Sequence, residues 1–153
     1  MPQLCFQGEV TSMKGFRHVT PIAVRFRDID AMGHVNNAVF FTYLESARVE
    51  YMRNVVFGTT SHNLSETGLI LARISCDFRQ PIFYGQKVEV GTKVAEIRNS
   101  SFLIEQRIEA DGQLAALAKA VVVCYDYQAG ASVRVSDEFR ARVEAFEVEE
   151  DEA

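Results

Sequence analysis

Apolar and polar residues alternate along several stretches of the chain, with the period of two that is typical of a β-strand buried on one face. The first stretch is short, and three longer ones follow one another in the second half of the chain. Because Asp-Gly favours a two-residue hairpin turn, the pair at 111–112 predicts that the last of these folds back on a further strand. That strand contains an unbroken apolar run, which is typical of a strand covered on both faces. The predicted strands are Ile22–Phe26, Ile70–Arg79, Val88–Val94, Phe102–Glu109 and 115–127, with the apolar run at Ala120–Cys124.

A different period between residues 38 and 55 predicts a long helix. Phe40, Leu44 and Tyr51 recur at helical spacing, and further apolar positions widen this stripe over much of the helix circumference. Such a helix needs apolar cover on several sides, as when a sheet wraps around it. Two asparagines at its start can cap the first turn, and Gly58 can end it.

Together these elements predict an α+β domain in which an antiparallel sheet encloses one long helix. A shorter helix, capped by Ser136 and reaching about Phe146, follows the last strand. A chain of 153 residues suffices for a single domain and is too short for two ordinary ones. We therefore expect one domain over 1–153, with an N-terminal arm at 1–19 and an acidic tail at 147–153.

The charge of the chain argues against nucleic acid as a partner. Its 16 basic and 21 acidic residues give a net charge of −5, and five of the acids lie in the tail at 147–153. The remaining body is neutral and lacks the basic surface that binding to a phosphate backbone requires. The tail itself is typical of a solvated chain end.

The three cysteines favour a reducing compartment. Cys5, Cys76 and Cys124 follow no metal-binding spacing, and two of them lie in apolar runs, where a reduced thiol acts as a small hydrophobe. The sequence carries no export signal, and none of its apolar runs is long enough to span a membrane. We therefore expect a cytoplasmic protein without a membrane partner.

Most enzyme classes lack their signature in this sequence. It has no G-x-S-x-G elbow, no glycine-rich phosphate loop, no C-x-x-C pair and no H-E-x-x-H motif. Its three histidines are too scattered to predict a metal site. What remains is the polar segment Arg25–Asn37, which leads into the long helix with two carboxylates, an imidazole and two amides. A helix start offers unpaired N–H groups and the positive end of the helix dipole, so this segment can bind an anion or a developing oxyanion.

The same segment carries a family resemblance. The run D-x-D-x-x-G-H-V-N-N from Asp28, followed by F-x-x-Y-x-E-x-A-R from Phe40, resembles the signature of the 4-hydroxybenzoyl-CoA thioesterase family. Weaker similarity at Phe78–Ile82 and Asn99–Phe102 extends the resemblance over about residues 18–130. It implies a hot-dog fold, a sheet wrapped around one long helix, that forms dimers and often tetramers with the active site between subunits. It also implies hydrolysis of an acyl-CoA to a carboxylic acid and coenzyme A, with no metal and no organic cofactor.

The resemblance assigns roles to particular residues of this chain. It makes Asp30 the catalytic carboxylate, either as nucleophile or as general base toward water. It gives the backbone N–H of Asn37, at the helix start, the task of polarising the thioester carbonyl. The substrate is then expected to lie against His34, Val35, Asn36, Phe40 and Ser101.

Other charged residues nearby have simpler interpretations. Asp28 is expected to brace the loop, against Arg25 or Arg27, rather than to catalyse. Glu45 and Arg48 are three residues apart on the helix, where a side-chain ion pair is expected, although Glu45 is also a second candidate acid. Three arginines on the strands could hold the phosphates of coenzyme A: Arg73, Arg79 and Arg98.

Three alternative functions would use the same segment. One is hydrolysis of a thioester on an acyl carrier protein. A second is hydration of an enoyl thioester, since hydratases of this fold pair a histidine with an acid and the order of Asp28, Asp30 and His34 partly matches their spacing. A third is a non-catalytic module that binds acyl-CoA and signals through its oligomeric state.

Overall fold

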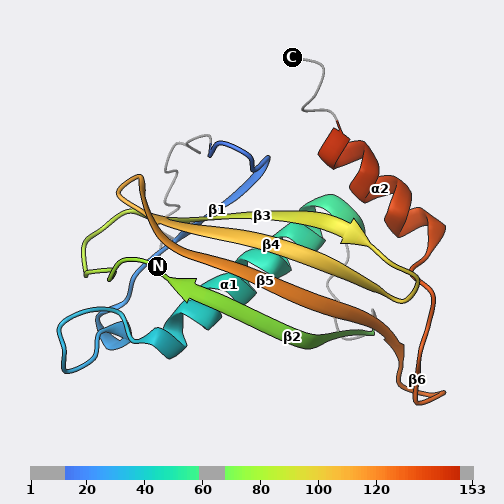
Figure 1. The fold of residues 1–153 in the computed structure, drawn as a ribbon, viewed down its shortest axis with the longest axis horizontal. Coiled ribbons are helices and arrows are strands. Elements are labelled where there is room, and N and C mark those ends of the chain that lie inside the picture. The colour runs from blue at the N-terminus through green and yellow to red at the C-terminus, as the bar shows by residue number, and fades with distance from the viewer. Residues whose placement is uncertain (1–12, 59–67, 149–153) are drawn as a thin grey trace, which may run out of the picture.

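The computed structural model describes residues 13–58 and 68–148, which form a curved antiparallel sheet and two α-helices (Figure 1). Strand β1 (His18–Ile22) leads through a 3-10 turn, η1 (Phe26–Asp28), to helix α1 (Asn37–Tyr51), which continues as the π-helix η2 (Met52–Phe57). Strands β2 (Leu69–Phe78), β3 (Val88–Ile97), β4 (Ser101–Ala110) and β5 (Gln113–Asp126) follow. The short strand β6 (Ala131–Ser132) and helix α2 (Asp137–Val148) close the described chain.

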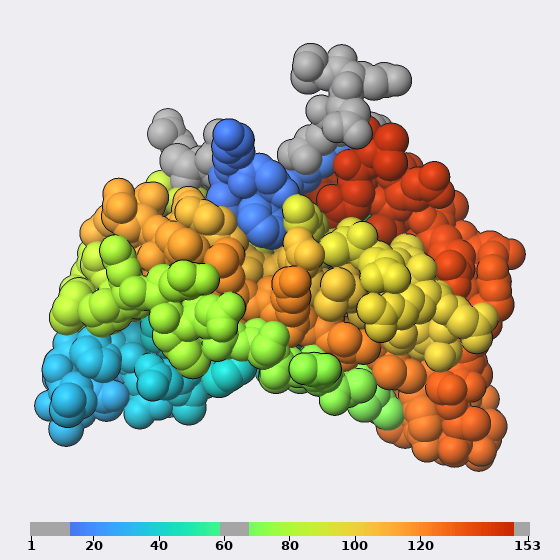
Figure 2. Space-filling model, viewed as in Figure 1, coloured from blue at the N-terminus to red at the C-terminus, as the bar shows by residue number. Residues whose placement is uncertain are grey.

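The strand order confirms the predicted antiparallel α+β architecture. The strands are arranged β1-β3-β4-β5-β2, and β6 pairs with the end of β5. The predicted hairpin at 111–112 joins β4 to β5, and both of its residues have positive φ, as in a type I′ turn. β1 and β2 are the two edges of the main sheet. Figure 2 shows β2, in green, along the lower margin of the face in view, with the start of α1 below it at the left.

The first predicted strand is wrong in position. The paired strand β1 begins and ends earlier, and Pro21 is tolerated in it because β1 is an edge strand. Beyond Ile22 the chain leaves the sheet, because the N–H (2.9 Å) and the guanidinium (3.2 Å) of Arg25 both donate to the carboxylate of Asp28 and close the turn η1. Phe26, which the alternation places on the buried face, is 81% exposed.

Helix α1 packs on one face of the sheet through two apolar clusters. The first surrounds Phe40, Leu44 and Ala47, and the second surrounds Tyr51 and η2 and also includes α2. Leu44, Ala47 and Tyr51 are completely buried, as their helical spacing predicts. The helical segment stops at Gly58, whose φ of 73° is favoured by glycine, so the predicted stop is confirmed.

The apolar run in β5 is covered on one face only. Ala120 and Val122 are buried beneath the helices, whereas Val121 and Val123 are half-buried on the other face. The expectation of cover on both faces is therefore wrong. The reason is that α1 and α2 both belong to the apolar clusters on the same side of the sheet.

Two expectations from composition concern the thiols and the membrane. Cys76 and Cys124 are free and half-buried, and burial raises the pKa of both thiols, as expected for small apolar side chains.

In the two described ranges, neither helix combines the length and the apolar character that a membrane crossing requires.

Helix α2 is tied to the core by Glu147, the first residue of the predicted tail. Tyr51 donates its hydroxyl to the carboxylate of Glu147 over 2.6 Å, and the N–H of Val94 in β3 donates to the same oxygen over 3.3 Å. Burial raises the pKa of Tyr51, and the bond to Glu147 raises it further. Val148 ends α2, and the last five residues of the predicted tail, 149–153, lie outside the described residues, as do Cys5, His62 and most of the predicted arm.

Replacing Glu147 with alanine is expected to lower the free energy of unfolding by about 2 kcal/mol, because the buried hydroxyl of Tyr51 loses its acceptor. Urea unfolding at neutral pH measures the change. Glu144, exposed on the same helix, gives a matched control, and Glu144→Ala should change the free energy by less than about 0.5 kcal/mol. Equal effects of the two substitutions would show that this bond does not hold α2 in place.

Candidate active site

The polar segment between η1 and α1 forms a loop held by backbone hydrogen bonds. Its residues 29 and 35 pair as an isolated antiparallel bridge. Val35 donates its N–H to the carbonyl of Ile82 over 2.8 Å, which fixes the loop against the segment between β2 and β3. Asn36 donates its N–H to the carbonyl of Asp28 over 2.9 Å. The chain therefore reaches the start of α1 along a defined path.

Asp28 braces this loop from within the core. It is 2% exposed, and its carboxylate accepts bonds from the N–H and the guanidinium of Arg25 and from the hydroxyl of Tyr43 on α1 (2.7 Å). Burial alone would raise the pKa of Asp28, but these three bonds outweigh it, and its pKa lies below the ordinary value. Burial and the bond to Asp28 both raise the pKa of Tyr43. The predicted brace is confirmed, with Arg25 as the partner.

Asp30 closes a tight turn in the same loop. Its carboxylate accepts the N–H of Met32 over 2.8 Å, and its carbonyl accepts the N–H of Gly33 over 3.0 Å. Gly33 has a φ of 89°, which residues with a Cβ rarely adopt, so glycine permits this turn. The second carboxylate oxygen lies 3.5 Å from the side-chain amide of Asn36. The half-buried carboxylate of Asp30 is therefore held beside the start of the helix.

Asn36 caps α1 and leaves one backbone donor unused. Its side-chain oxygen accepts the N–H of Ala38 over 2.8 Å, and its carbonyl accepts the N–H of Val39 over 2.9 Å, which confirms the predicted cap. The N–H of Asn37 is the first of the helix and has no partner within it. No acceptor for it lies in 13–58 or 68–148. A free donor thus lies at the positive end of the helix dipole, one residue after the asparagine whose amide is 3.5 Å from the carboxylate of Asp30.

A cleft of about 240 Å³ opens beside this helix start. The loop, the first turn of α1 and the segment after β2 form its wall, with His34, Val35, Asn37, Phe40, Phe78, Arg79, Gln80 and Pro81. Phe40 and Phe78 pack edge to face, with ring centres 5.1 Å apart, and supply its apolar side. In the described part of the chain, no group of three His, Cys, Asp or Glu side chains is placed to hold a metal ion. The cleft therefore offers an N–H donor, an apolar wall and the cation of Arg79.

The structure brings all but one of the predicted site residues together. Asp30, His34, Val35, Asn36, Asn37 and Phe40 lie in the loop or in the first turn of α1. Ser101 begins β4 and pairs with Val123. The cleft lies at the other end of β4. Its residue Arg79 donates its N–H to the carbonyl of Ala115 near the start of β5, and the start of β5 pairs with the end of β4. The length of β4, about 30 Å, therefore separates Ser101 from the cleft within one chain.

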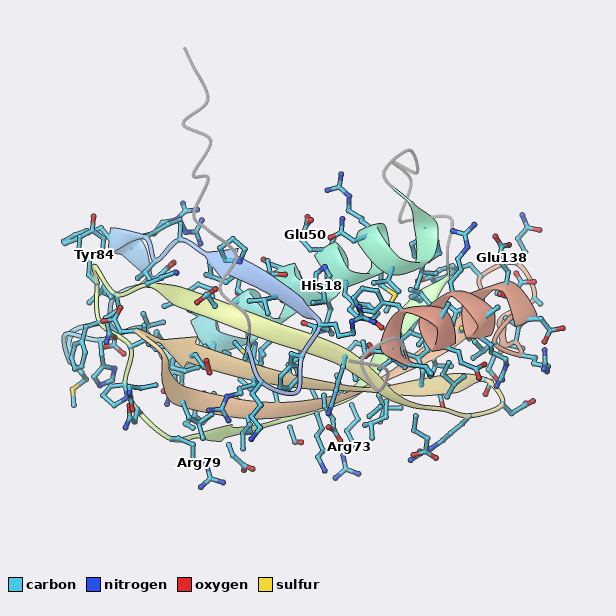
Figure 3. The ribbon with its side chains drawn as sticks, turned by 90° about the horizontal axis from the view of Figure 1, so that it is seen from above. His18, Glu50, Arg73, Arg79, Tyr84 and Glu138 are labelled. Atoms are coloured by element: carbon cyan, nitrogen blue, oxygen red, sulfur yellow. The ribbon has the colours of Figure 1, made fainter. Side chains whose placement is uncertain are left out.

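The three arginines named for coenzyme A phosphates also lie apart. Arg79 lines the cleft, and Figure 3 shows it at the same end of the molecule as Tyr84, with Glu138 at the other end. Arg73 lies in the middle of β2, on an exposed position. Arg98 forms an ion pair with Glu96 at 3.3 Å, in the turn between β3 and β4. Arg79 is therefore the best placed of the three for a ligand in the cleft.

The expected ion pair between Glu45 and Arg48 is wrong. Arg48 instead passes beneath the helix and donates to the side-chain oxygen of Gln106 in β4 over 3.2 Å. Burial lowers the pKa of Arg48, and the neighbouring charge of Glu45 partly offsets this shift. Spacing along a helix shows which side chains can meet, but not which of them the sheet covers, so no sequence pattern indicated this contact.

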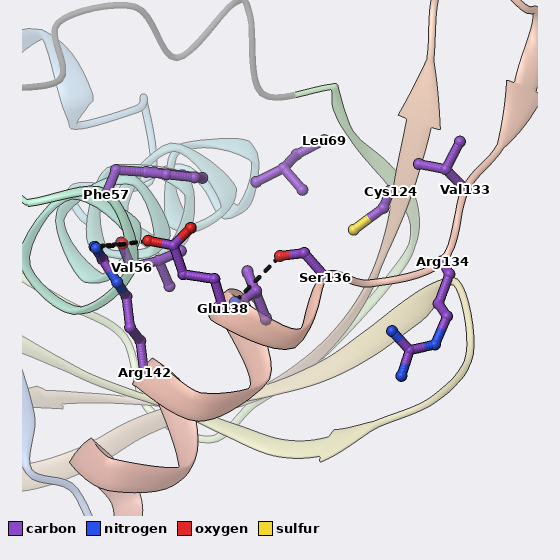
Figure 4. Close-up of a pocket in the computed structure, with 10 residues that line it drawn as sticks. Val56, Phe57, Leu69, Cys124, Val133, Arg134, Ser136, Glu138 and Arg142 are labelled. Atoms are coloured by element: carbon purple, nitrogen blue, oxygen red, sulfur yellow. Dashed lines mark hydrogen bonds and ion pairs between the residues drawn. The ribbon is translucent and has the colours of Figure 1, made fainter.

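A second cavity, of about 330 Å³, lies at the far end of α1 (Figure 4). Its polar groups already have structural partners. The hydroxyl of Ser136 accepts the N–H of Phe139 and caps α2, as predicted, and Arg142 pairs with Glu138 at 2.8 Å and bonds the carbonyl of Val56. The cavity contains none of the predicted site residues, so we place the candidate active site in the cleft beside Asn37.

Comparisons with known proteins agree with this fold. Residues 24–143 match the model of the Thioesterase-like superfamily. The long-chain acyl-CoA thioesterase FadM of Escherichia coli is 27% identical over 129 residues, which cover 82% of this chain and 96% of FadM. The acyl-CoA thioesterase YbgC of Haemophilus influenzae is 30% identical over 108 residues, which cover 69% of this chain and 79% of YbgC.

A solved structure extends this similarity to the fold. A thioesterase from Thermus thermophilus, complexed with coenzyme A and zinc, has a TM-score of 0.80 and 34% identity to this chain. The match covers 89% of this chain and 98% of that one. A predicted thioesterase from Bacillus stearothermophilus has a TM-score of 0.76 and 25% identity, over 84% of this chain and 94% of that one. These neighbours confirm the predicted hot-dog fold.

Replacing Asp28 with asparagine is expected to lower the free energy of unfolding by about 2–3 kcal/mol at pH 7, because charged hydrogen bonds within the core are lost. Folding lowers the pKa of Asp28. Its contribution is therefore fully present above the unfolded pKa of about 3.9 and disappears as the pH falls through the folded value. The difference between the wild type and the variant should shrink as the pH falls below about 4.

Urea unfolding measured from neutral to acid pH tests this expectation. Asp77→Asn is the matched control, because Asp77 is exposed on β2 and should change the free energy of unfolding little at any pH. A difference between wild type and Asp28→Asn that stays constant with pH would contradict the ionic role of Asp28.

Proposed function

Since the chain belongs to the Thioesterase-like superfamily, we propose that it is an acyl-CoA thioesterase, which hydrolyses an acyl-CoA to a carboxylic acid and coenzyme A. Two relatives named as acyl-CoA thioesterases and a coenzyme A complex of a similar structure support this reaction. The observation that carries the proposal is the unpaired N–H of Asn37 on the wall of a cleft. The carboxylate of Asp30 lies 3.5 Å from the side-chain amide of the preceding residue, Asn36.

The helix start stabilises the charge that develops during thioester hydrolysis. Attack on the carbonyl carbon moves an electron pair onto the carbonyl oxygen, which becomes an oxyanion. The N–H of Asn37 donates to that oxygen, and the dipole of α1 favours its negative charge. A donor in this position is worth about 3 kcal/mol of transition-state stabilisation. The side chain of Asn37 is not needed for this task.

Asp30 supplies the base or the nucleophile. As a base it takes a proton from water while the water oxygen attacks the carbonyl carbon; the C–S bond then breaks and the thiolate of coenzyme A takes up a proton. As a nucleophile its carboxylate attacks the same carbon, expels the thiolate and forms an anhydride, which water hydrolyses. Either route uses the held carboxylate beside the helix start and needs no cofactor.

The remaining cleft residues position the thioester. Phe40 and Phe78 contact the first part of the acyl group, and Arg79 is placed for a phosphate of coenzyme A. His34 lines the cleft, with its Nδ1 3.4 Å from the carbonyl of Val35, so its ring can orient the thioester or the water. Val35 and Asn36 contribute through the backbone and through the cap of α1.

The protein is a homo-oligomer in this proposal, built from dimers that pair along β2. The outer edge of β2 pairs with no other strand of the described residues. Along the margin between β2 and α1, three large apolar side chains are exposed by 36–44%: Phe41, Leu71 and Phe78. An open strand edge next to apolar surface is a template for pairing with a second copy.

Such a dimer also accounts for the predicted role of Ser101. Ser101, Val123 and Ile70 lie side by side in the sheet, near the start of β2, whereas the cleft adjoins the end of β2 at Phe78. Antiparallel pairing of two β2 strands places the start of one strand beside the end of the other. Ser101 of the partner subunit then lies at the same end as the cleft, which one chain alone does not achieve.

Replacing Asp30 with alanine or asparagine is expected to lower kcat by at least about a hundredfold, because the base or nucleophile is lost. Release of free thiol from short, medium, long and aromatic acyl-CoAs measures this, after subtraction of the signal from the cysteines of the protein. Asp111→Asn, at the hairpin between β4 and β5, is a control that should retain the activity of the wild type.

Other outcomes of this experiment would contradict the proposal. Thiol release by wild type that persists in both Asp30 variants would exclude Asp30 as the catalytic acid. No release from any acyl-CoA would overturn the reaction. The same panel presented on an acyl carrier protein, and water addition to an enoyl-CoA, would then identify the two enzymatic alternatives, whereas binding without turnover would identify a sensor.

Replacing Phe41 with lysine is expected to convert the dimer to a monomer, because a charge then lies on the apolar margin that the partner covers. Light scattering after size exclusion measures the mass, and far-ultraviolet circular dichroism checks the fold. Val148→Lys, on the exposed end of α2, should leave the dimer intact. A wild type that is monomeric at micromolar concentration would contradict the proposed assembly.

A further inference from the structure

A groove of about 270 Å³ runs between the second half of α1 and the sheet, beside the edge strand β2. Its wall is largely apolar and comprises Val49, Met52, Leu69, Leu71, Phe102, Ile104 and Val122. Two charged side chains, Glu45 and Arg48, complete it. The groove lies along the same margin of α1 and β2 as the candidate cleft. The cleft is at the other end of this margin, where Phe40 of α1 and Phe78 of β2 line it. The groove is thus placed to receive the far part of an acyl chain whose thioester lies in the cleft.

Arg48 is a buried cation in this apolar wall. Its side chain is 9% exposed, and its guanidinium makes a single hydrogen bond within the described residues, to the side-chain oxygen of Gln106. Gln106 is itself fixed, because its amide donates to the carbonyl of Leu44 over 2.9 Å and to the hydroxyl of Thr92 over 3.1 Å. The fixed amide presents its oxygen to Arg48 and holds the guanidinium at the groove.

The remaining donors of Arg48 lack acceptors in this chain. A guanidinium carries five N–H groups, and no carboxylate forms an ion pair with that of Arg48 in 13–58 or 68–148. The unpaired nitrogens of Arg48 are not among the fully buried unpartnered atoms of the described residues, so they are open to the groove. A ligand oxygen can replace water there, and the apolar wall around it strengthens the bond. Glu45 lines the same groove and has no hydrogen bond in the described residues, so its carboxylate is an unused acceptor beside the unused donors.

We propose that this groove binds the acyl chain of the substrate and that Arg48 and Glu45 together recognise a hydroxyl group near its far end. A hydroxyl oxygen accepts from the guanidinium of Arg48, and its proton is donated to the carboxylate of Glu45. The apolar wall contacts the methylene groups on the way. This inference rests on the proposed thioesterase function and specifies its substrate class as hydroxylated acyl chains.

The length of the helix sets the position of the hydroxyl. Asn37, where the thioester carbonyl binds, and Arg48 are 11 residues apart on α1, which corresponds to about 16 Å along the helix axis. An extended chain of single bonds advances about 3.5 Å for every three atoms, so the path takes about 14 atoms. A hydroxyl at the end of a twelve-carbon acyl chain fits this distance, whereas one close to the thioester does not.

Hydrolysis and binding of matched compounds test the inference. For hydrolysis, kcat/KM is compared for dodecanoyl-CoA, 12-hydroxydodecanoyl-CoA and 3-hydroxydodecanoyl-CoA. For binding without chemistry, calorimetry compares the uncleavable thioethers dodecyl-CoA and 12-hydroxydodecyl-CoA. We expect the 12-hydroxyl to raise both kcat/KM and affinity by about tenfold or more, the gain typical of a hydrogen bond to a charged group, and the 3-hydroxyl to add nothing.

Variants assign the preference to the two charged residues. Arg48→Met, which removes the donors at similar volume, should abolish the preference for the 12-hydroxyl, and Glu45→Leu should reduce it severalfold. Glu45 is exposed, so Glu45→Leu keeps the test decisive if Arg48→Met fails to fold. Glu50→Gln is the matched control on α1, because Glu50 pairs with Arg53 and does not line the groove, and it should leave the preference unchanged (Figure 3).

The outcomes separate this inference from the proposed function. Hydrolysis of all three acyl-CoAs at equal rates, or a preference that Arg48→Met does not change, overturns the hydroxyl site and leaves the thioesterase intact. A hydroxyl preference in thioether binding without any hydrolysis supports the site and overturns the reaction. A change of oligomeric mass in Arg48→Met, with the preference retained, overturns the site and assigns Arg48 to the subunit contact. Failure of every coenzyme A compound to bind overturns both.

Discussion

The candidate site depends on one buried carboxylate, that of Asp28. A charge in the core is costly unless it is paired, and here donors from Arg25 and Tyr43 compensate it. Because these donors belong to η1 and to α1, the same carboxylate fixes the helix against the turn that precedes it. The carbonyl of Asp28 then accepts the N–H of Asn36 and sets the direction in which the chain enters the helix. The free N–H of Asn37 is a consequence of this entry, because Asn36 accepts the N–H groups of Ala38 and Val39 and leaves that of Asn37 without a partner.

Local pattern predicted those features in which one residue and its immediate neighbours decide the structure. The alternation in β3 and β4, the Asp-Gly hairpin and the asparagine cap were correct, because strand period, turn geometry and capping act over a few residues. In β2 the predicted alternation holds from Ile74 onward, since an irregularity between Leu71 and Arg73 shifts the phase of its first part. The same reasoning failed at Ile22–Phe26. The alternation continues there, but the side chain of Asp28, three residues beyond Arg25, draws the chain into a turn. A local hydrogen bond thus outweighed a correct apolar period.

Features that depend on distant parts of the chain were not predictable in this way. Periodicity showed that the helix around Arg48 is apolar on several sides, but not that Gln106, 58 residues later, meets it beneath the helix. The cover of β5 on a single face depends likewise on where α2 packs. For the site, the motif grouped the loop residues correctly, whereas Ser101 lies at the other end of the sheet. A motif assembled along the sequence does not show which of its parts require a second chain.

The margin between α1 and β2 connects the two binding regions with the proposed assembly. The cleft and the groove both border it, and Phe41, Leu71 and Phe78 are exposed along it. Exposed apolar side chains favour the binding of another apolar surface. An acyl chain bound in the cleft and the groove would contact part of the same margin. A partner subunit seated on β2 would therefore exclude water from the ligand as well as from the interface. Because removal of water strengthens every electrostatic contact, the donors at Asn37 and Arg48 would act more strongly in the assembled protein than in a single chain.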